Sequence, residues 1–379
     1  MLTMTTADDT RTVSTLGRTE AAVPHTLATT RERRGLTAKQ VSEALGRSAS
    51  YVSRAEAGST KVSGDDLERY AAVLDVTPEL LCTPLPIEPP EGVHFRSHAI
   101  PNKVRAQVIS HANYVAWLLN QIHRHVDIVA DLPRRLPQVD VDLLDGGPEE
   151  AAQIVRHMWR LHGPVADIAR LLEQTGVFIV PMPADIAKID AITVRTDGSI
   201  TAVILLADDR PEDRKRHTLA HELAHLVMDE ASGARLGLKE IEERADRFAG
   251  EFLAPYMELR ERLIGITPNQ LSELQALQAK WGVSLSAIIR RAYMHDDITE
   301  SQYRYWFRVL NGRNLLRGNT SKAHPVHTVA IANFLHTVRE LEYSASDIMA
   351  MTVTRPYELQ EIFGHAWPYP SLRPRLRSV

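Results

Sequence analysis

The sequence lacks the features that mark secreted and membrane proteins. Among 379 residues there is one cysteine, Cys82, and no run of 18 apolar residues. A single cysteine excludes an internal disulfide, and without a long apolar run no ordinary membrane-spanning helix is expected. No apolar core of a secretory leader stands near the first residues. We therefore expect a cytoplasmic protein with no membrane partner.

The chain also has no strong overall charge. The net charge of −4 excludes a uniformly basic surface for a polyanion, so any surface that binds nucleic acid must be local. The hydrophobic content of 44% is ordinary for globular proteins, and the length allows two or three domains. The periodicity of apolar residues predicts an α+β fold that is mainly helical.

The stretch at residues 214–230 carries the clearest chemistry. It places His221 and His225 four residues apart, with Glu222 directly after the first. On a helix this spacing sets both imidazoles on one face, where they can bind one zinc ion, and leaves Glu222 beside them to act on a water molecule. His217 lies four residues before His221, but no glutamate follows it, and we interpret it as structural. An apolar stripe at helical spacing indicates packing against a core: Leu219, Leu223, Leu226 and Val227.

A zinc site with an open position needs a third protein ligand, for which residues 241–255 are the predicted source. Their pattern predicts an amphipathic helix with Glu242 and Asp246 four residues apart. One carboxylate can then reach the metal while the other accepts the remaining N–H of a ligating histidine. Glu242 is the predicted ligand and Asp246 its supporting partner, with Glu243 as the alternative ligand.

These two stretches together resemble the ImmA/IrrE family of metallopeptidases. The matching letters are R-x-R-H-T-L-A-H-E-L-A-H-L-V and E-x-x-A-D-x-F-A-x-x-F-L-A-P. The resemblance implies a zincin-like peptidase core, zinc held by His221, His225 and Glu242, and Glu222 as general base. It also implies a protein substrate, because the family includes proteins that cleave phage or stress repressors. Asp246 departs from the asparagine frequent in the family, and so does Ala224 from glycine, but neither change removes a ligand.

The residues from 25 to 83 form a run of short helical patterns, predicted at 27–34, 38–45, 49–57, 65–74 and 78–82. The run R-E-R-R-G-L-T-A-K-Q-V-S-E-A-L-G-R-S-A-S-Y-V-S-R-A-E-A-G resembles the XRE family of helix-turn-helix regulators. The resemblance makes 49–57 the recognition helix and pairs Arg31 with Glu56 as an internal salt bridge. It directs four side chains toward the major groove of double-stranded DNA: Ala49, Ser50, Ser53 and Arg54.

Local charge agrees with DNA binding. Residues 25–64 hold seven Lys or Arg and three Glu, a net of +4 in an acidic protein. Arg54 suits guanine, while Lys39 and Arg47 can meet phosphates. A helical protein-interaction module is the alternative. Helix-turn-helix readers commonly bind as two-fold dimers, so a homodimer is expected.

The remaining composition divides the chain into six segments. A stiff linker with four prolines at 84–90 is expected to separate the DNA module from the rest. Strands are predicted at 177–180, 191–195 and 200–207, the last two joined by a hairpin turn at Asp197 and Gly198.

The predicted segments are a disordered tail (1–24), the five-helix DNA-binding domain (25–85), a linker and helical connector (86–147), the zinc peptidase core (148–258), a helical, helix-turn-helix-like support region (259–312) and a C-terminal helical region of unknown role (313–379).

Two functional hypotheses follow from the combination. In the first, a DNA-bound regulator carries its own zinc metalloendopeptidase, which cleaves a repressor, an antitoxin or itself after a stress or phage signal. In the second, the protein is a transcription factor whose peptidase fold is inert or serves as a sensor. An antitoxin-like interaction module is a third hypothesis, which the fusion disfavours. Tyr256, Tyr293 and His295 are candidates for stabilising an oxyanion.

Overall fold

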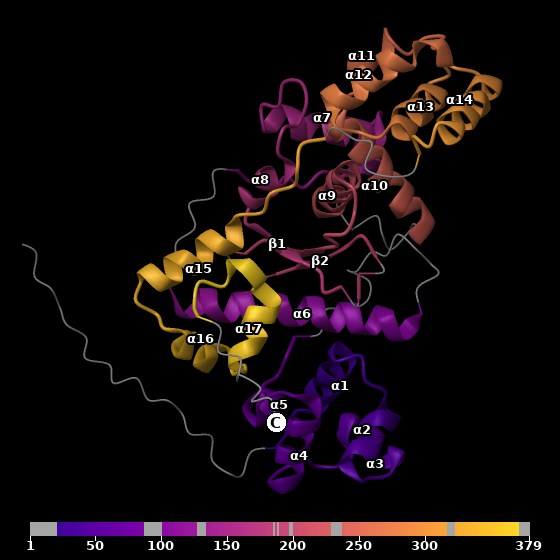
Figure 1. The fold of residues 1–379 in the computed structure, drawn as a ribbon. Helices are drawn as coiled ribbons and strands as arrows, with labels where there is room; N and C mark the ends of the chain where they lie inside the picture. Colours follow the sequence, from indigo (N-terminus) through magenta and orange to yellow (C-terminus); the bar gives the residue numbers. More distant parts are fainter. Residues whose placement is uncertain are drawn as a thin grey trace, which may run out of the picture.

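The computed structural model describes eight stretches of the chain (Figure 1), and they are mainly helical with one small sheet, as predicted. In these stretches no helix is long and apolar enough to cross a membrane. The described residues are 21–86, 101–126, 134–184, 186–187, 189–196, 200–228, 237–316 and 323–370.

Residues 21–86, here called the N-terminal domain, form five helices close to the predicted ones. The turn after the second helix needs Gly46, whose φ of +64° suits glycine, and the capping box of Thr37 and Gln40 fixes that helix's start. Ala44 was predicted to pack between the second and third helices with Val41, Leu45 and Val52, but it is exposed. The helices are α1 (Pro24–Arg33), α2 (Ala38–Leu45), α3 (Ala49–Glu56), α4 (Asp65–Leu74) and α5 (Pro78–Cys82).

The start of the described chain is tied to this domain. Ala21 forms an isolated bridge with Ser63, and the Val23 N–H donates to the Leu81 carbonyl at 2.8 Å. Residues 21–24 are therefore part of the folded domain, although they were assigned to the tail. The rest of the predicted disordered tail, residues 1–20, lies outside the described residues.

Helix α6 (Asn102–His125) lies between the N-terminal domain and the sheet (Figure 1). It contacts α1 on one side and strands β2 (Ala191–Arg195) and β3 (Ala202–Leu206) on the other. One hydrophobic core joins residues of the N-terminal domain, α6, one sheet face and the C-terminal helices. The expectation that a linker separates the N-terminal domain is thus wrong, because α6 buries apolar side chains toward both neighbours. Residues 87–100, with two of the four prolines, lie outside the described residues.

The central domain, residues 134–255, is built around a three-stranded sheet in the order β1-β3-β2. Strand β3 pairs in parallel with β1 and antiparallel with β2, and the predicted turn at 197–199 lies outside the described residues. The remaining elements are η2 (Val141–Leu143), α7 (Gly147–Met158), α8 (Ile168–Glu173), β1 (Val177–Pro181), α9 (Glu212–Val227) and α10 (Leu238–Leu253).

Strand β3 is buried on both faces because two cores meet there. Val203 and Leu205 join the core shared with the N-terminal domain. Ala202, Ile204 and Leu206 face the other way, into a second core that α7 to α10 share. Alternation along the strand explains why all five of its residues are apolar and buried. One face of the sheet thus packs against α9 through this second core.

The support region, residues 256–316, packs beyond α10 and contains a helix-turn-helix-like pair. Gly282 (φ +64°) and the N-capping Ser284 repeat the backbone pattern of Gly46 and Ser48. The buried Arg216 of α9 donates to the Gly282 carbonyl at 3.3 Å. The turn is therefore fixed to the central domain, which favours the support role. The elements are α11 (Met257–Arg260), η4 (Pro268–Gln270), α12 (Leu271–Trp281), α13 (Leu285–Met294) and α14 (Glu300–Gly312).

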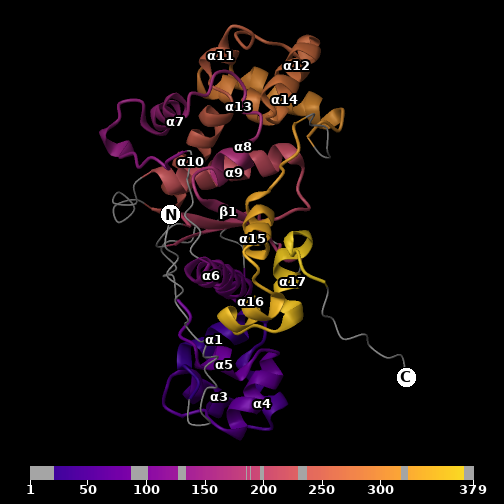
Figure 2. The same cartoon turned by 90° about the vertical axis from the view of Figure 1, so that its left-hand side faces the viewer.

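The C-terminal helices return to the middle of the molecule. Figure 2 shows them beside α6, between the sheet and the N-terminal domain. They contact α6 and β1, so the last part of the chain closes the core that α6 shares with the N-terminal domain. The sequence pattern predicts helices at 328–341 and 345–352, close to the first two, but not α17. They are α15 (Ala330–Glu340), α16 (Ala345–Thr352) and α17 (Pro356–Phe363), followed by η5 (Gly364–Ala366).

Candidate functional site

Helices α9 and α10 bring two histidines and a glutamate to one point. One ligand atom from each of His221, His225 and Glu242 lies within 4.8 Å of the others. The Nε2 atoms of the two imidazoles are 3.1 Å apart. His221 Nε2 lies 3.2 Å from Glu242 Oε2, and His225 Nε2 lies 3.6 Å from Glu242 Oε1. The three side chains can thus hold a single cation between them.

Asp246 orients the first imidazole. Its Oδ1 lies 2.9 Å from His221 Nδ1, so a proton on that nitrogen leaves Nε2 directed at His225 and Glu242. Burial lowers the pKa of His221, but hydrogen bonds with Asp246 and Glu242 outweigh it and raise that pKa to about 9. Without a metal the raised pKa favours the imidazolium form of His221, and a cation would displace the proton on Nε2.

The donor set fits zinc. Two imidazole nitrogens and a carboxylate with a position left open are the ligands that catalytic zinc takes. Glu242 Oε2 is buried and lies 3.2 Å from His221 Nε2, an ion pair when that imidazole is protonated. A metal cation bound between the two side chains would take the place of that proton. The alternative ligand Glu243 is 63% exposed beside Lys239.

His217 does not join the cluster. Of the described His, Cys, Asp and Glu residues, only the three named above form a group at metal-ligand spacing. His217 is half-buried one turn before His221 on α9. This placement agrees with a structural interpretation of His217.

Glu222 is held by a residue that the sequence analysis did not identify. Thr193 Oγ1 donates a hydrogen bond of 2.6 Å to Glu222 Oε2, and both side chains are buried. Thr193 lies on β2, an edge of the described sheet, and Arg195 on the same strand donates to the His225 carbonyl at 2.8 Å. Strand β2 thus fixes both the carboxylate and the end of α9. No sequence pattern predicts this role for Thr193, a strand residue two positions before Arg195.

The candidates for an oxyanion stabiliser lie elsewhere. Tyr256 follows the end of α10, and the eleven residue steps from Glu242 to Leu253 span about 16 Å of helix. The Tyr256 hydroxyl donates to Asp297 at 2.6 Å, and its ring stacks on His295 at 3.8 Å. Tyr293 packs against Tyr303 in the support region. In this structure these side chains contact one another and Asp297 at the junction with the support region.

The N-terminal domain exposes all six side chains expected at DNA: Lys39, Arg47, Ala49, Ser50, Ser53 and Arg54. Arg47 is also paired within the domain, because Asp66 at the start of α4 binds it at 2.8 Å and the Tyr51 hydroxyl donates to the same carboxylate. A phosphate would have to compete with Asp66 for this guanidinium.

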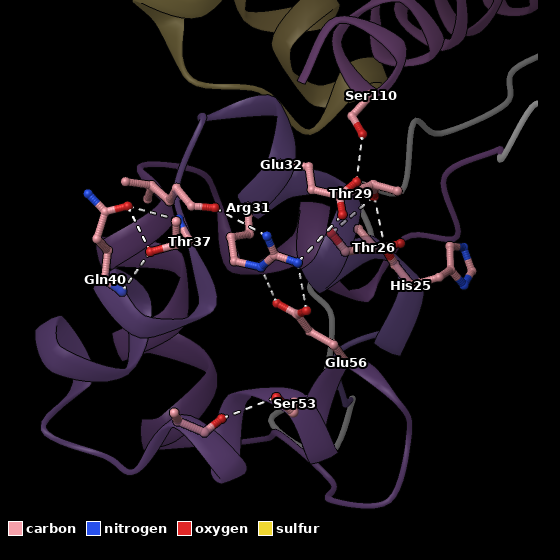
Figure 3. A network of polar contacts seen from close by, with 12 residues as sticks. His25, Thr26, Thr29, Arg31, Glu32, Thr37, Gln40, Ser53, Glu56 and Ser110 are labelled. Atoms are coloured by element: carbon pink, nitrogen blue, oxygen red, sulfur yellow. Dashed lines mark hydrogen bonds and ion pairs between the residues drawn. The ribbon is translucent and has the colours of Figure 1, made fainter. Parts of the chain in front are cut away.

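The predicted internal salt bridge is present and is drawn in Figure 3. Arg31 donates to Glu56 through Nε at 2.6 Å and Nη2 at 2.8 Å, a bidentate pair between α1 and α3. Ser53 points its hydroxyl back to the Ala49 carbonyl on the same helix. The pair fixes α3 against α1 and leaves the opposite face of α3 open.

Comparison with known families matches two separate parts of the chain. Residues 25–81 match the helix-turn-helix domain, and residues 172–293 match the IrrE N-terminal-like domain, a peptidase family. The chain joins these two domains. The first match covers α1 to α5, and the second covers the sheet, α9, α10 and the helices as far as α13. No curated protein and no solved structure matches the chain significantly.

Both family resemblances are thereby confirmed at the level of domains. A chain that contains a DNA-binding fold and a peptidase-like fold has the domain composition of a regulator with a peptidase-like domain.

Proposed function

We propose that this protein is a DNA-binding transcriptional regulator whose central domain is a zinc metalloendopeptidase. The observation that carries the proposal is the convergence of His221, His225 and Glu242, with the buried Glu222 beside them. Its substrate is a repressor, an antitoxin or a second copy of this chain.

The residues of the site have separate roles in peptide hydrolysis. His221, His225 and Glu242 hold the zinc, which when bound polarises the peptide carbonyl and makes water more acidic. Glu222 takes a proton from the attacking water and delivers it to the leaving amine nitrogen as the C–N bond breaks. Thr193 keeps the carboxylate in one orientation through its hydrogen bond to Oε2.

The edge strand β2 offers a place for the substrate backbone. It is paired only with β3 within the described sheet and carries the residue that holds Glu222. An extended peptide added to such an edge forms main-chain hydrogen bonds whatever its sequence. The protein substrate is then selected by contacts beyond the strand or by its presence on the same DNA.

The zinc content of the purified wild type and of two variants tests the metal assignment. We expect one zinc per wild-type chain by elemental analysis after zinc loading. His221→Ala loses the metal, because one of three ligands and the partner of Asp246 are removed. His217→Ala is the matched control on the same helix and keeps it. Wild type without zinc, or equal loss in both variants, rejects the assignment.

Glu222→Gln separates the peptidase from an inert sensor. It leaves the three ligands in place and removes the base, so zinc stays and cleavage of a partner protein falls by about 100-fold or more. Wild type and the variant are mixed with proteins encoded beside the gene and with a second copy of the chain, and fragments are read by mass spectrometry. Equal cleavage by both proteins would mean that another residue is the base. No cleavage by the wild type would favour an inert fold that serves as a sensor.

A further inference from the structure

The turn before the recognition helix carries an arginine that another helix holds. Arg47 lies between Gly46, where α2 ends, and Ser48, the N-cap of α3. Its main-chain N–H donates to the Ser42 carbonyl at 2.9 Å, so the backbone of the turn is fixed. Its Nη2 lies 2.8 Å and 3.1 Å from the two carboxylate oxygens of Asp66, in the first turn of α4. The guanidinium is therefore anchored to α4 through one nitrogen.

Tyr51 completes this contact from α3. Its hydroxyl donates to Asp66 Oδ2 at 2.9 Å, and the Arg47 guanidinium lies 5.2 Å from the centre of its ring. Hydrogen bonds from Arg47 and Tyr51 hold the pKa of Asp66 below its usual range, so the carboxylate is charged at neutral pH. An isolated ion pair at a surface orients its side chains weakly, whereas a network of several groups restricts them more. The turn, α3 and α4 together thus fix where the guanidinium lies.

The anchor leaves other donors of Arg47 unused. Among the described residues, its Nε and Nη1 make no hydrogen bond, and its side chain is 44% exposed. Both nitrogens carry N–H donors. A second molecule can thus bind Arg47 without displacing Asp66, provided that it tolerates the carboxylate beside it.

The phosphate groups of DNA tolerate that carboxylate poorly. A phosphate that approaches Arg47 meets the negative charge of Asp66 at the same guanidinium, so the two anions repel each other or one displaces the other. The edges of bases in the major groove are neutral and present acceptors, such as N7 and O6 of guanine. The contact with Asp66 therefore disfavours a phosphate and leaves a base edge unopposed.

The position of Arg47 in the domain also favours a base edge. In helix-turn-helix proteins the N-terminal residues of the recognition helix contact base edges in the major groove, and Arg47 directly precedes that helix. Lys39 on α2 differs, because it is 80% exposed and lies 3.8 Å from Glu43 on its own helix, a pair that contributes little. Lys39 thus stays available to a phosphate, whereas the charge of Arg47 is already balanced.

We propose that Asp66 sets the DNA selectivity of this protein by directing Arg47 to a base edge and away from phosphate. Asp66 is a positioning residue, since it acts through Arg47 and not by contact with DNA. The proposal reassigns Arg47, which the sequence predicted to meet a phosphate. It rests on the DNA binding proposed above and does not depend on peptidase activity.

Replacing Arg47 in the full-length protein tests which group it contacts. Duplexes are selected from a random pool, and binding of a selected and a scrambled duplex is measured from about 50 to 200 mM KCl. Arg47→Ala should lose discrimination at one base pair by about 5- to 150-fold, at a position other than the one that Arg54→Ala affects. The slope of log K against log salt should stay the same. A slope lower by about 0.9 with the base preference intact would assign Arg47 to a phosphate and overturn the proposal.

Asp66→Asn tests the directing role, because it keeps the shape of the side chain and removes the charge. Arg47 is then free to meet a phosphate, so the salt slope should steepen by about 0.9 and binding of the scrambled duplex should rise about tenfold. Discrimination at the base pair that Arg47 reads should fall. Asp65→Asn is the matched control, since Asp65 is exposed in the same turn of α4 and the change in charge is equal. Equal effects in the two aspartate variants would reduce the result to net charge and overturn the proposal.

The double variant Arg47→Ala/Asp66→Asn separates action through Arg47 from any structural effect of Asp66. Without Arg47, the Asp66→Asn change should no longer steepen the salt slope, which is the coupling that a double-mutant cycle measures. A slope that steepens equally in both backgrounds overturns the proposal. Failure of DNA binding itself gives a different result, because a wild type that selects no sequence from the pool rejects the DNA-binding role together with this inference. A wild type that selects a sequence, beside an Arg47→Ala protein of unchanged preference, rejects this inference alone.

Discussion

The hydrogen bond between Thr193 and Glu222 joins residues 29 positions apart and fixes the orientation of the Glu222 carboxylate. The proximity of His221 and His225 is a local product of one helical turn. The sequence therefore predicted the cluster, including Glu242 over Glu243. It could not predict Thr193, because the contact depends on how a strand of the sheet lies against α9 and leaves no spacing to detect.

Replacing Thr193 tests its role in orienting the base. Thr193→Val keeps the shape and strand preference of the side chain but removes the donor, so zinc content should stay at the wild-type value. A hydrogen bond to a charged group contributes about 1.5–3 kcal/mol. We therefore expect kcat to fall by about 10- to 100-fold with little change in KM, measured on the substrate that wild type cleaves.

Thr193→Ser is the matched control, since it restores the hydroxyl. Recovery of most of the lost kcat in this variant supports orientation through the hydrogen bond. A serine variant as slow as the valine variant would instead assign the defect to packing on β2.

At the scale of elements, the helices of the N-terminal domain were predicted more accurately than their environment. Caps and glycines act within a few residues, so Thr37 and Gly46 fix the ends of α2 whatever surrounds it. Helix α17 was missed although it has proline at its first position and packs Leu359, Ile362 and Phe363 into the core. Eight residues are too few for the helical periodicity of apolar residues to be recognised.

Helix α3 gives a prediction about DNA. Its exposed face and the basic side chains around it should bind duplex DNA with an affinity that falls steeply as salt rises. Arg54→Ala should cost roughly 1–3 kcal/mol at one base position if the guanidinium is bidentate to guanine. Mobility shifts on randomised duplexes, followed by sequencing of the bound fraction, measure both effects.

Arg54→Lys is the control for charge alone. It keeps the cation but loses the planar pair of donors, so sequence preference should be lost while the salt dependence stays. An Arg54→Lys protein with unchanged preference would mean that Arg54 contacts phosphate only. Deleting residues 1–85 should abolish binding, and retained binding would assign DNA recognition to the α12–α13 unit.

The whole molecule differs most from what the sequence predicted. Prolines suggested two modules on a linker, whereas α6 and the C-terminal helices pack the N-terminal domain and the sheet around one core. An amphipathic pattern shows that a face is buried but not which partner covers it. Helix α6 has such a face toward each neighbour. No sequence pattern predicts the contact between Arg33 and Glu358, because it forms only when α1 and α17 pack together.

The coupling of DNA binding to proteolysis is testable in cells. Glu222 is buried on α9, and its replacement by the isosteric glutamine changes neither the N-terminal domain nor the Arg33–Glu358 pair. We therefore expect Glu222→Gln to occupy the same DNA sites as wild type in chromatin immunoprecipitation. Regulation by cleavage needs a protein that disappears when Glu222 is intact, so the regulated transcript should fail to switch and that protein should persist. His217→Ala is the control on the same helix. If Glu222→Gln switches the transcript normally, the site serves as a scaffold, and the regulator acts through binding alone.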